Sequence, residues 1–219
     1  MVKKIVIKVG GSLADVAKPL LEALFKLIKK YSILIVPGGW KFADLVKEID
    51  KKYKLPLEIA HKMAILGMEQ YGLFLSGLSP YTRTTIALKE AEQITDRLPI
   101  FLPMKIALMA NFQPSWDVTS DTIAAYIAKL FKADKFIIAT DVDGIFSSDP
   151  KVNRTAQLIS KITANELLSW CKKTSIDKML PKFLLEEKMS CWVVNGKYPK
   201  RLTAIIYGKN TIATEIVGE

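Results

Sequence analysis

The chain has 219 residues, of which 50% are apolar and 25% charged, and its formal net charge is +10 at pH 7. This apolar fraction excludes a disordered protein, because disordered chains lack the apolar surface whose burial offsets the entropy of ordering. No apolar run approaches the roughly 18 residues that span a bilayer. No signal-peptide core follows the first residues, so we expect a cytoplasmic protein with no membrane partner.

The positive charge raises the question of a nucleic-acid partner, but its distribution argues against one. Of the 32 basic residues, 28 are lysines scattered along the chain, often beside acidic residues, and four are arginines. Arginine is the side chain that grips phosphates bidentately and reads base edges. We therefore expect no nucleic acid, while a basic protein still suits a small anionic substrate.

Few residues are available for metal or thiol chemistry. The cysteines, Cys171 and Cys191, are interpreted as reduced, half-buried thiols, since a disulfide or metal site needs more partners or a tighter spacing. The single histidine, His61, excludes a multi-histidine metal centre. We expect no metal site built from protein ligands.

Strand-like and helix-like segments alternate through the first half of the chain. Short β-branched runs that end in glycine pairs predict strands, and longer amphipathic runs predict helices. In chain order we expect a strand (residues 4–9), a helix capped by Asp15 (15–30), a strand (33–36) and helices over 42–53 and 57–75.

The alternation continues in the second half, after a middle segment (76–103) with weaker signals. We expect a helix (86–91), a strand (106–110), a helix capped by Thr119 (123–130), a strand (135–139), helices (165–172, 178–188), a strand (191–194), a helix (199–206) and a last short strand. Such alternation predicts an α/β fold, a three-layer αβα sandwich around a mainly parallel central sheet.

Three candidate ligand-binding segments follow predicted strands. They are Gly10-Gly11-Ser12, Gly38-Gly39 and residues 141–144. Ligands bind at the carboxyl ends of parallel strands, and glycines let backbone N–H groups approach phosphate oxygens. Each glycine pair alone is equally well explained as a tight turn. Asp117 and Asp121 flank the next helix start, where the macrodipole by itself favours acidic residues. The P-loop and dinucleotide fingerprints are absent from the sequence.

Six segments in the same order resemble the amino acid kinase family. They are residues 8–12, 37–39, 117–121, 140–146 with 149–151, 179–182 and 208–216. The resemblance implies ATP-dependent phosphorylation of a small molecule by one domain over 1–219, with an acceptor-binding lobe (1–110) and an ATP-binding lobe (111–219). It also implies a homo-oligomer, a dimer or larger.

The resemblance assigns roles to individual residues. Lys8 would bridge the transferred phosphoryl group and the acceptor, Lys182 would neutralise charge on the ATP phosphates, and Asp121 would hold both lysines. Phosphoryl transfer depends on such positioning and spread positive charge. The implied phosphate- or ATP-binding residues are Gly10, Gly11, Ser12, Asp141, Asp143, Gly144, Phe146 and Lys151. The implied acceptor-binding residues are Gly38, Gly39, Trp40, Lys41 and Asp117. Mg²⁺ would arrive with ATP and take few protein ligands.

Departures from the family pattern bear on the acceptor. Trp40 stands where most relatives have a third glycine, so we expect it to narrow the acceptor side or stack on a ring there. Lys41 either grips an acceptor anion or is a surface lysine. The isopentenyl phosphate branch uses a histidine near the second glycine loop. His61 lies about twenty residues beyond that loop and is interpreted as helical packing, which disfavours this branch.

Among compact members, the sequence resembles the branch that converts [5-(aminomethyl)furan-3-yl]methyl phosphate to its diphosphate in methanofuran biosynthesis. Residues 36–40 and 116–121 carry this resemblance. Trp40, Tyr71 and Tyr81 would then line a pocket for the furan ring. Uridylate kinase and carboxylate kinase activities of the same family stay open, as does a nucleotide- or oxyanion-binding storage protein.

Overall fold

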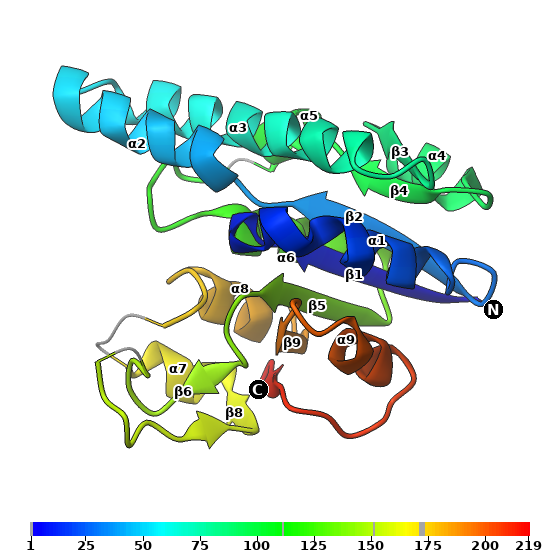
Figure 1. The fold of residues 1–219 in the computed structure, drawn as a ribbon. Coiled ribbons are helices and arrows are strands. Elements are labelled where there is room, and N and C mark those ends of the chain that lie inside the picture. Colours follow the sequence, from blue (N-terminus) through cyan, green and yellow to red (C-terminus); the bar gives the residue numbers. More distant parts are fainter. Residues whose placement is uncertain (1, 111, 151, 171–173) are drawn as a thin grey trace.

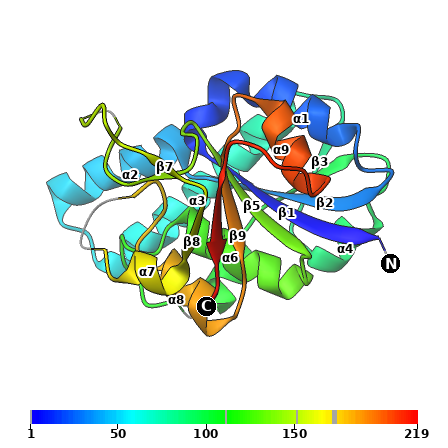
Figure 2. The ribbon, with the colours of Figure 1, turned by 90° about the horizontal axis from the view of Figure 1, so that it is seen from below.

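The computed structural model describes residues 2–110, 112–150, 152–170 and 174–219. Eight strands form one sheet in the order β3-β4-β2-β1-β5-β9-β10-β8, with helices on both of its faces (Figures 1 and 2). Every neighbouring pair is parallel except β9 and β10. This confirms the predicted α/β sandwich around a mainly parallel sheet.

The strands of the first half lie on one side of the sheet and those of the second half on the other. The first four are β1 (Lys3–Val9), β2 (Tyr31–Pro37), β3 (Thr82–Thr85) and β4 (Leu98–Phe101). The others are β5 (Lys135–Thr140), β8 (Lys161–Thr163), β9 (Cys191–Asn195) and β10 (Thr214–Val217). A separate antiparallel pair comprises β6 (Ile145–Phe146) and β7 (Leu158–Ile159). The division into two lobes stays a prediction.

The helices and a short 3-10 helix (Gly11–Val16) connect these strands. They are α1 (Ala17–Phe25), α2 (Trp40–Tyr53), α3 (Leu57–Gly77), α4 (Leu88–Gln93), α5 (Met104–Met109), α6 (Ser120–Phe131), α7 (Ala164–Leu168), α8 (Leu180–Glu186) and α9 (Pro199–Ile206). None of the helices in the described ranges is long and apolar enough to cross a membrane.

Two apolar cores lie on the two faces of the sheet, because successive side chains of a strand point to opposite faces. From β1, Ile5, Ile7 and Val9 belong to the core beneath α1 and α9, while Val6 belongs to the core beneath α6 and α8. Figure 2 shows α1 and α9 together over one face. Lys8 shares the face of Val6, so its side chain is directed toward the α6 side of the sheet.

Several element predictions differ from the structure. The chain forms a 3-10 helix and then α1 where a helix over 15–30 was expected, and Asp15 lies inside the 3-10 helix instead of capping α1. Residues 106–109 belong to α5, with Ala110 at its C-cap position, and do not form the expected strand. A short apolar run does not distinguish a helix from a strand. The strands β3 and β4 were not predicted, and β4 contains Pro99, which lacks an N–H for the ladder. The two- and three-residue strands β6, β7 and β8 were not predicted either.

Other predicted elements are confirmed with shifted ends. The helix expected to begin at residue 123 begins at Ser120, with Thr119 at the N-cap position but without a capping side-chain bond to its own helix. The helices expected over 165–172 and 178–188 are the shorter α7 and α8. Residues 171–173, with Cys171, lie outside the described residues. Cys191 is fully buried, more than the half-buried thiol expected.

Candidate active site

A buried ion pair joins the first strand to the start of α6. Lys8 is near the carboxyl end of β1, and its Nζ lies 2.7 Å from Oδ1 of Asp121, the second residue of α6. The two side chains are only 11% and 8% exposed. Both residues were expected at the catalytic centre, and the fold brings them together from distant parts of the sequence.

The two glycine loops lie against each other at the carboxyl ends of β1 and β2. The Gly10 N–H donates to the Ala139 carbonyl (2.9 Å) and the Gly38 N–H donates to the Val9 carbonyl (2.8 Å). A Cβ on Gly11 would collide with the backbone of Trp40, and one on Gly38 would come within 3.2 Å of the Gly11 nitrogen. Close approach of the two loops therefore requires glycine, whatever the loops bind.

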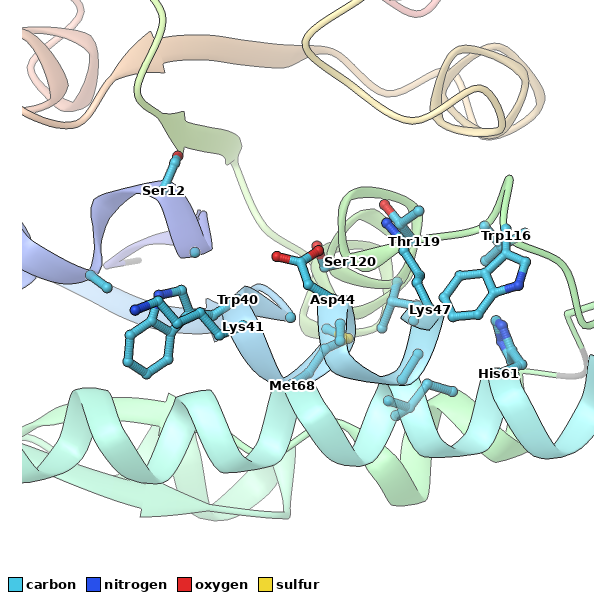
Figure 3. Close-up of a pocket in the computed structure, with 18 of the residues that line it drawn as sticks. Ser12, Trp40, Lys41, Asp44, Lys47, His61, Met68, Trp116, Thr119 and Ser120 are labelled. Carbon is cyan, nitrogen blue, oxygen red and sulfur yellow. The ribbon is translucent and has the colours of Figure 1, made fainter. Parts of the chain in front are cut away.

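An open cavity of about 560 Å³ begins at these loops and extends between α2, α3 and the start of α6 (Figure 3). Beside apolar side chains, its lining comprises the glycines Gly11 and Gly39 and the polar or aromatic residues Ser12, Asp15, Trp40, Lys41, Asp44, Lys47, His61, Trp116, Thr119 and Ser120. The size falls within the range of small-molecule sites, roughly 300–1,000 Å³. The predicted residues Gly11, Ser12, Gly39, Trp40 and Lys41 thus share one cavity.

The cavity holds both signs of charge. Asp44 points into it in Figure 3 and forms no ion pair with any residue in the described part of the chain. Lys41 and Lys47 place their ammonium groups 5.6 Å from the ring centroids of Trp40 and Trp116, respectively. Lys41 thus lines the cavity while lying over an aromatic ring.

Hydrogen bonds hold the far end of the cavity. The Trp116 indole N–H donates to Asp50 Oδ2 (2.9 Å), and His61 Nδ1 lies 3.3 Å from the Ser115 carbonyl oxygen. Burial lowers the pKa of His61, which favours the neutral imidazole. A carbonyl only accepts, so Nδ1 carries the proton and Nε2 is left as an acceptor. His61 therefore lines the cavity as well as packing in α3, which the sequence did not indicate.

The aromatic pocket expected for the acceptor ring is wrong in two of its three members. Tyr71 is fully buried, and its hydroxyl donates to the Gly10 carbonyl at 3.1 Å. Tyr81 stacks on Phe25 with ring centroids 4.4 Å apart. Neither lines the cavity, where Trp116 supplies an aromatic wall instead.

Trp40 replaces the usual glycine in an unusual backbone conformation. Its φ is +47°, in the left-handed region that disfavours side chains. Its ring lies 5.4 Å from Tyr71 and 4.6 Å from Phe74, centroid to centroid. Packing of the ring against α3 thus holds Trp40 in place, and the residue borders the cavity beside Gly11.

The predicted nucleotide loop is anchored to neighbouring elements of the second half of the chain. Asp143 Oδ1 accepts from Asn195 Nδ2 (2.9 Å) and from Arg201 Nη1 (2.6 Å). Gly144 has φ +151°, and a Cβ there would collide with Thr214. Asp143 and Gly144 therefore tie the loop to β9, α9 and β10. Asp141 precedes them, with its carbonyl accepting from Asn195 Nδ2 at 3.3 Å. Phe146 lies in β6, and Lys151 falls outside the described residues.

Two predicted residues lie apart from the Lys8–Asp121 pair. Lys182, in α8, has a side chain 56% exposed, and its Nζ is 3.9 Å from Glu186. No contact joins it to Asp121 within the described residues. Asp117 lies outside the cavity lining and pairs at the surface with Lys178 (3.1 Å). Asp121 was expected to hold both lysines, but the structure shows it in contact with Lys8 and not with Lys182.

Asp177 is a buried residue that the sequence analysis missed. It precedes α8, and its carboxylate accepts hydrogen bonds from Thr119, Thr122 and Leu180. Its backbone N–H donates to Asp121 Oδ2 (3.1 Å). A single aspartate before a short helix carries no local pattern, so only the fold reveals it. Within the described residues, no three His, Cys, Asp or Glu side chains are placed to hold a metal ion.

The fold is shared with a family of phosphotransferases, and the sequence matches that family directly. Residues 3–195 match the Amino acid kinase family, so the chain belongs to that family. It is 38% identical over 219 residues to the [5-(aminomethyl)furan-3-yl]methyl phosphate kinase of Methanocaldococcus jannaschii, covering 97% of each chain. It is 27% identical to the uridylate kinase of Pyrococcus abyssi, covering 94% of this chain and 96% of that one.

Solved structures agree on the fold. The structure of uridylate kinase from Archaeoglobus fulgidus superposes with a TM-score of 0.76 at 21% identity, covering 97% of this chain and 99% of that chain. UMP kinase from Ureaplasma parvum gives the same TM-score at 23% identity, covering 99% of both chains. Similarity at this level of identity shows the shared architecture alone.

Proposed function

We propose that the protein is an ATP-dependent kinase that phosphorylates [5-(aminomethyl)furan-3-yl]methyl phosphate to its diphosphate. The observation that carries this proposal is the buried Lys8–Asp121 pair beside a cavity that starts at two glycine loops. The 38% identity with a kinase of that name, over nearly the full length of both chains, supports the choice of acceptor.

The geometry suits phosphoryl transfer between two phosphates. An oxygen of the acceptor phosphate attacks the γ-phosphorus of ATP, and the bond to the β-phosphate oxygen breaks as ADP leaves with the electron pair. Lys8, held by Asp121, would stabilise the negative charge on the transferred group. The N–H groups of Gly11 and Gly39 would face its oxygens, because those of Gly10 and Gly38 donate to the Ala139 and Val9 carbonyls. Mg²⁺ would be bound by the nucleotide phosphates, where it offsets their charge.

The cavity fits an acceptor with a phosphate at one end and an ammonium at the other. The glycine loops mark the phosphate end, where Lys41 adds positive charge. Asp44 offers a carboxylate that no other described residue neutralises, and the aromatic face of Trp116 lies further along. A carboxylate pairs with an ammonium through a charge-assisted hydrogen bond, so Asp44 would select the aminomethyl group.

The proposal is tested by ATP turnover with a panel of acceptors and an Asp44→Asn variant. The panel contains the aminomethylfuran phosphate, its analogue lacking the amino group, UMP, isopentenyl phosphate and glutamate. We expect turnover of the first, and a KM about 10- to 150-fold higher in Asp44→Asn, the factor expected for losing a hydrogen bond to a charged group. The amine-free analogue should not distinguish Asp44→Asn from wild type. Glu48→Gln, which changes an exposed carboxylate of the same helix outside the cavity, is the matched control.

Uridylate kinase activity is the second candidate, favoured by relatives of 23–27% identity that carry that name. Turnover of UMP without turnover of the furan phosphate would overturn the proposed acceptor and retain the class of reaction. Binding of ATP without phosphorylation of any acceptor in the panel would instead indicate a nucleotide-binding storage protein.

We further propose that ATP lies over the second half of the sheet and that the protein self-associates. The cavity is lined mostly by residues before 110, which leaves the carboxyl ends of β5 and β9 for the nucleotide. Exposed apolar side chains on α3, including Leu66 and Leu73, offer a contact surface. Light scattering coupled to size exclusion tests the self-association, and a monomer at micromolar concentration would contradict it.

A further inference from the structure

One buried carboxylate joins the starts of two helices in this fold. Asp177 Oδ2 accepts from the Thr119 N–H (3.0 Å), the Thr119 hydroxyl (2.9 Å) and the Thr122 N–H (2.9 Å). Its Oδ1 accepts from the Thr122 hydroxyl (2.6 Å) and the Leu180 N–H (2.8 Å). The N-cap residues of α6 and α8 supply no capping side-chain bond of their own. Asp177 therefore caps both helices at once.

The same residue connects the two predicted catalytic lysines. The Asp177 N–H donates to Asp121 Oδ2 (3.1 Å), while Asp121 Oδ1 holds Lys8 Nζ (2.7 Å). On the other side, the carboxylate fixes the first residue of α8, Leu180, two positions before Lys182. A continuous chain of polar contacts thus runs from Lys8 through Asp121 and Asp177 to the helix that carries Lys182.

Burying a carboxylate costs more free energy than capping a helix requires. Asp177 is 9% exposed and pairs with no basic side chain among the described residues. Burial, and then the nearby Asp121 carboxylate, raise its pKa above the ordinary value, while its hydrogen bonds with Thr122 and Thr119 oppose this. A neutral serine or asparagine would cap either helix without this penalty. One carboxylate shared by two helices adds what separate caps cannot, a fixed relation between them.

We infer that Asp177 is a positioning residue that sets α8, and with it Lys182, against the Lys8–Asp121 pair. The inference rests on the proposed function only in assuming that Lys182 meets the ATP phosphates. Asp121 does not reach Lys182 itself, so Asp177 supplies the link that the family resemblance assigned to Asp121 alone. A displaced α8 would weaken stabilisation of the transferred phosphoryl group while leaving the acceptor cavity intact.

A double-mutant cycle tests this with Asp177→Asn and Lys182→Met. Asn keeps the shape and one acceptor oxygen but turns an NH₂ group toward N–H donors. We expect Asp177→Asn to lower kcat about 10- to 100-fold with the acceptor KM changed less than about 3-fold. In the Lys182→Met background the same change should lower kcat by less than about 3-fold, because the positioned group is gone.

Controls separate positioning from general stability. Thr163→Ala removes the capping box of α7, where the Thr163 hydroxyl accepts from the Glu166 N–H at 3.0 Å, and should lower the melting temperature without a comparable loss of kcat. Thr122→Val, which removes one donor to Asp177 and keeps the side-chain shape, repeats the cycle if Asp177→Asn does not fold.

Losses that multiply in the double variant show that Asp177 does not act through Lys182 and overturn the inference, as does an unchanged kcat in Lys182→Met. The cycle runs on whichever acceptor the wild-type protein phosphorylates. Failure with the furan phosphate therefore removes the proposed acceptor, while the result of the cycle decides on Asp177 separately.

Discussion

Replacing Lys8 with methionine would leave the Asp121 carboxylate buried without its cation. The two side chains are 11% and 8% exposed, and the Nζ–Oδ1 distance is 2.7 Å. Removing one partner of a buried pair costs about 3–5 kcal/mol, because the remaining charge stays desolvated. For a chain of this size each kcal/mol lowers the melting temperature by roughly 2–4 °C. We therefore expect Lys8→Met to melt roughly 6–20 °C below wild type.

The matched variant combines Lys8→Met with Asp121→Asn, which removes both charges and keeps an oxygen for the Asp177 N–H. It should recover most of the lost free energy of unfolding, to within about 1–2 kcal/mol of wild type, while phosphoryl transfer stays abolished in both variants. Urea unfolding at pH 7, followed by circular dichroism, measures these free energies. A single variant that loses less than about 1 kcal/mol, as an exposed pair would, refutes the reasoning. So does a double variant no more stable than the single one.

Three further predictions concern separate parts of the site. Lys182→Met should lower kcat about 10²- to 10³-fold in steady-state assays. Its melting temperature should stay unchanged because the side chain is 56% exposed; normal turnover would exclude a catalytic role. Trp40→Gly relieves a left-handed φ worth roughly 1–2 kcal/mol but loses aromatic packing worth about 3–5 kcal/mol, so urea unfolding should show a net loss; a more stable variant would mean that strain dominates. Titration of His61, the single histidine, followed by NMR should give a pKa below 6.5. Because the unfolded chain binds that proton more readily, wild type should lose stability faster than His61→Gln as pH falls below 6.5, and equal slopes would contradict the burial argument.

The sequence predicted the strands that carry the site because their signals are local and strong. Buried runs such as β1 and β5, each followed by a glycine or aspartate turn, leave few alternative structures. The short strands β3 and β4 escaped prediction since each has four residues and β4 contains Pro99. The run over 106–110 was assigned to a strand, whereas in the structure Pro103 is the N-cap residue of α5, which begins at Met104.

Within the site, the family motifs singled out Lys8 and Asp121 but gave no sign of the residues that only the fold brings together. Lys8 and Asp121 lie in recognisable segments, and the structure pairs them. Asp44, His61 and Trp116 meet in one cavity from α2, α3 and the loop before α6, and no spacing in the sequence relates them. Asp177 depends on five donors from two helices, which only tertiary structure assembles.

The continuity of the sheet limits how the enzyme can enclose its substrates. β1 and β5 pair directly over five residue positions, so the sheet passes without interruption from the acceptor side to the proposed nucleotide side. A hinge between the two halves would have to bend or break this ladder. Water is therefore excluded from the reacting phosphates by movement of the loops at the carboxyl ends of the strands. Residues 112–119 and the turn after β5 are the parts whose movement should accompany turnover.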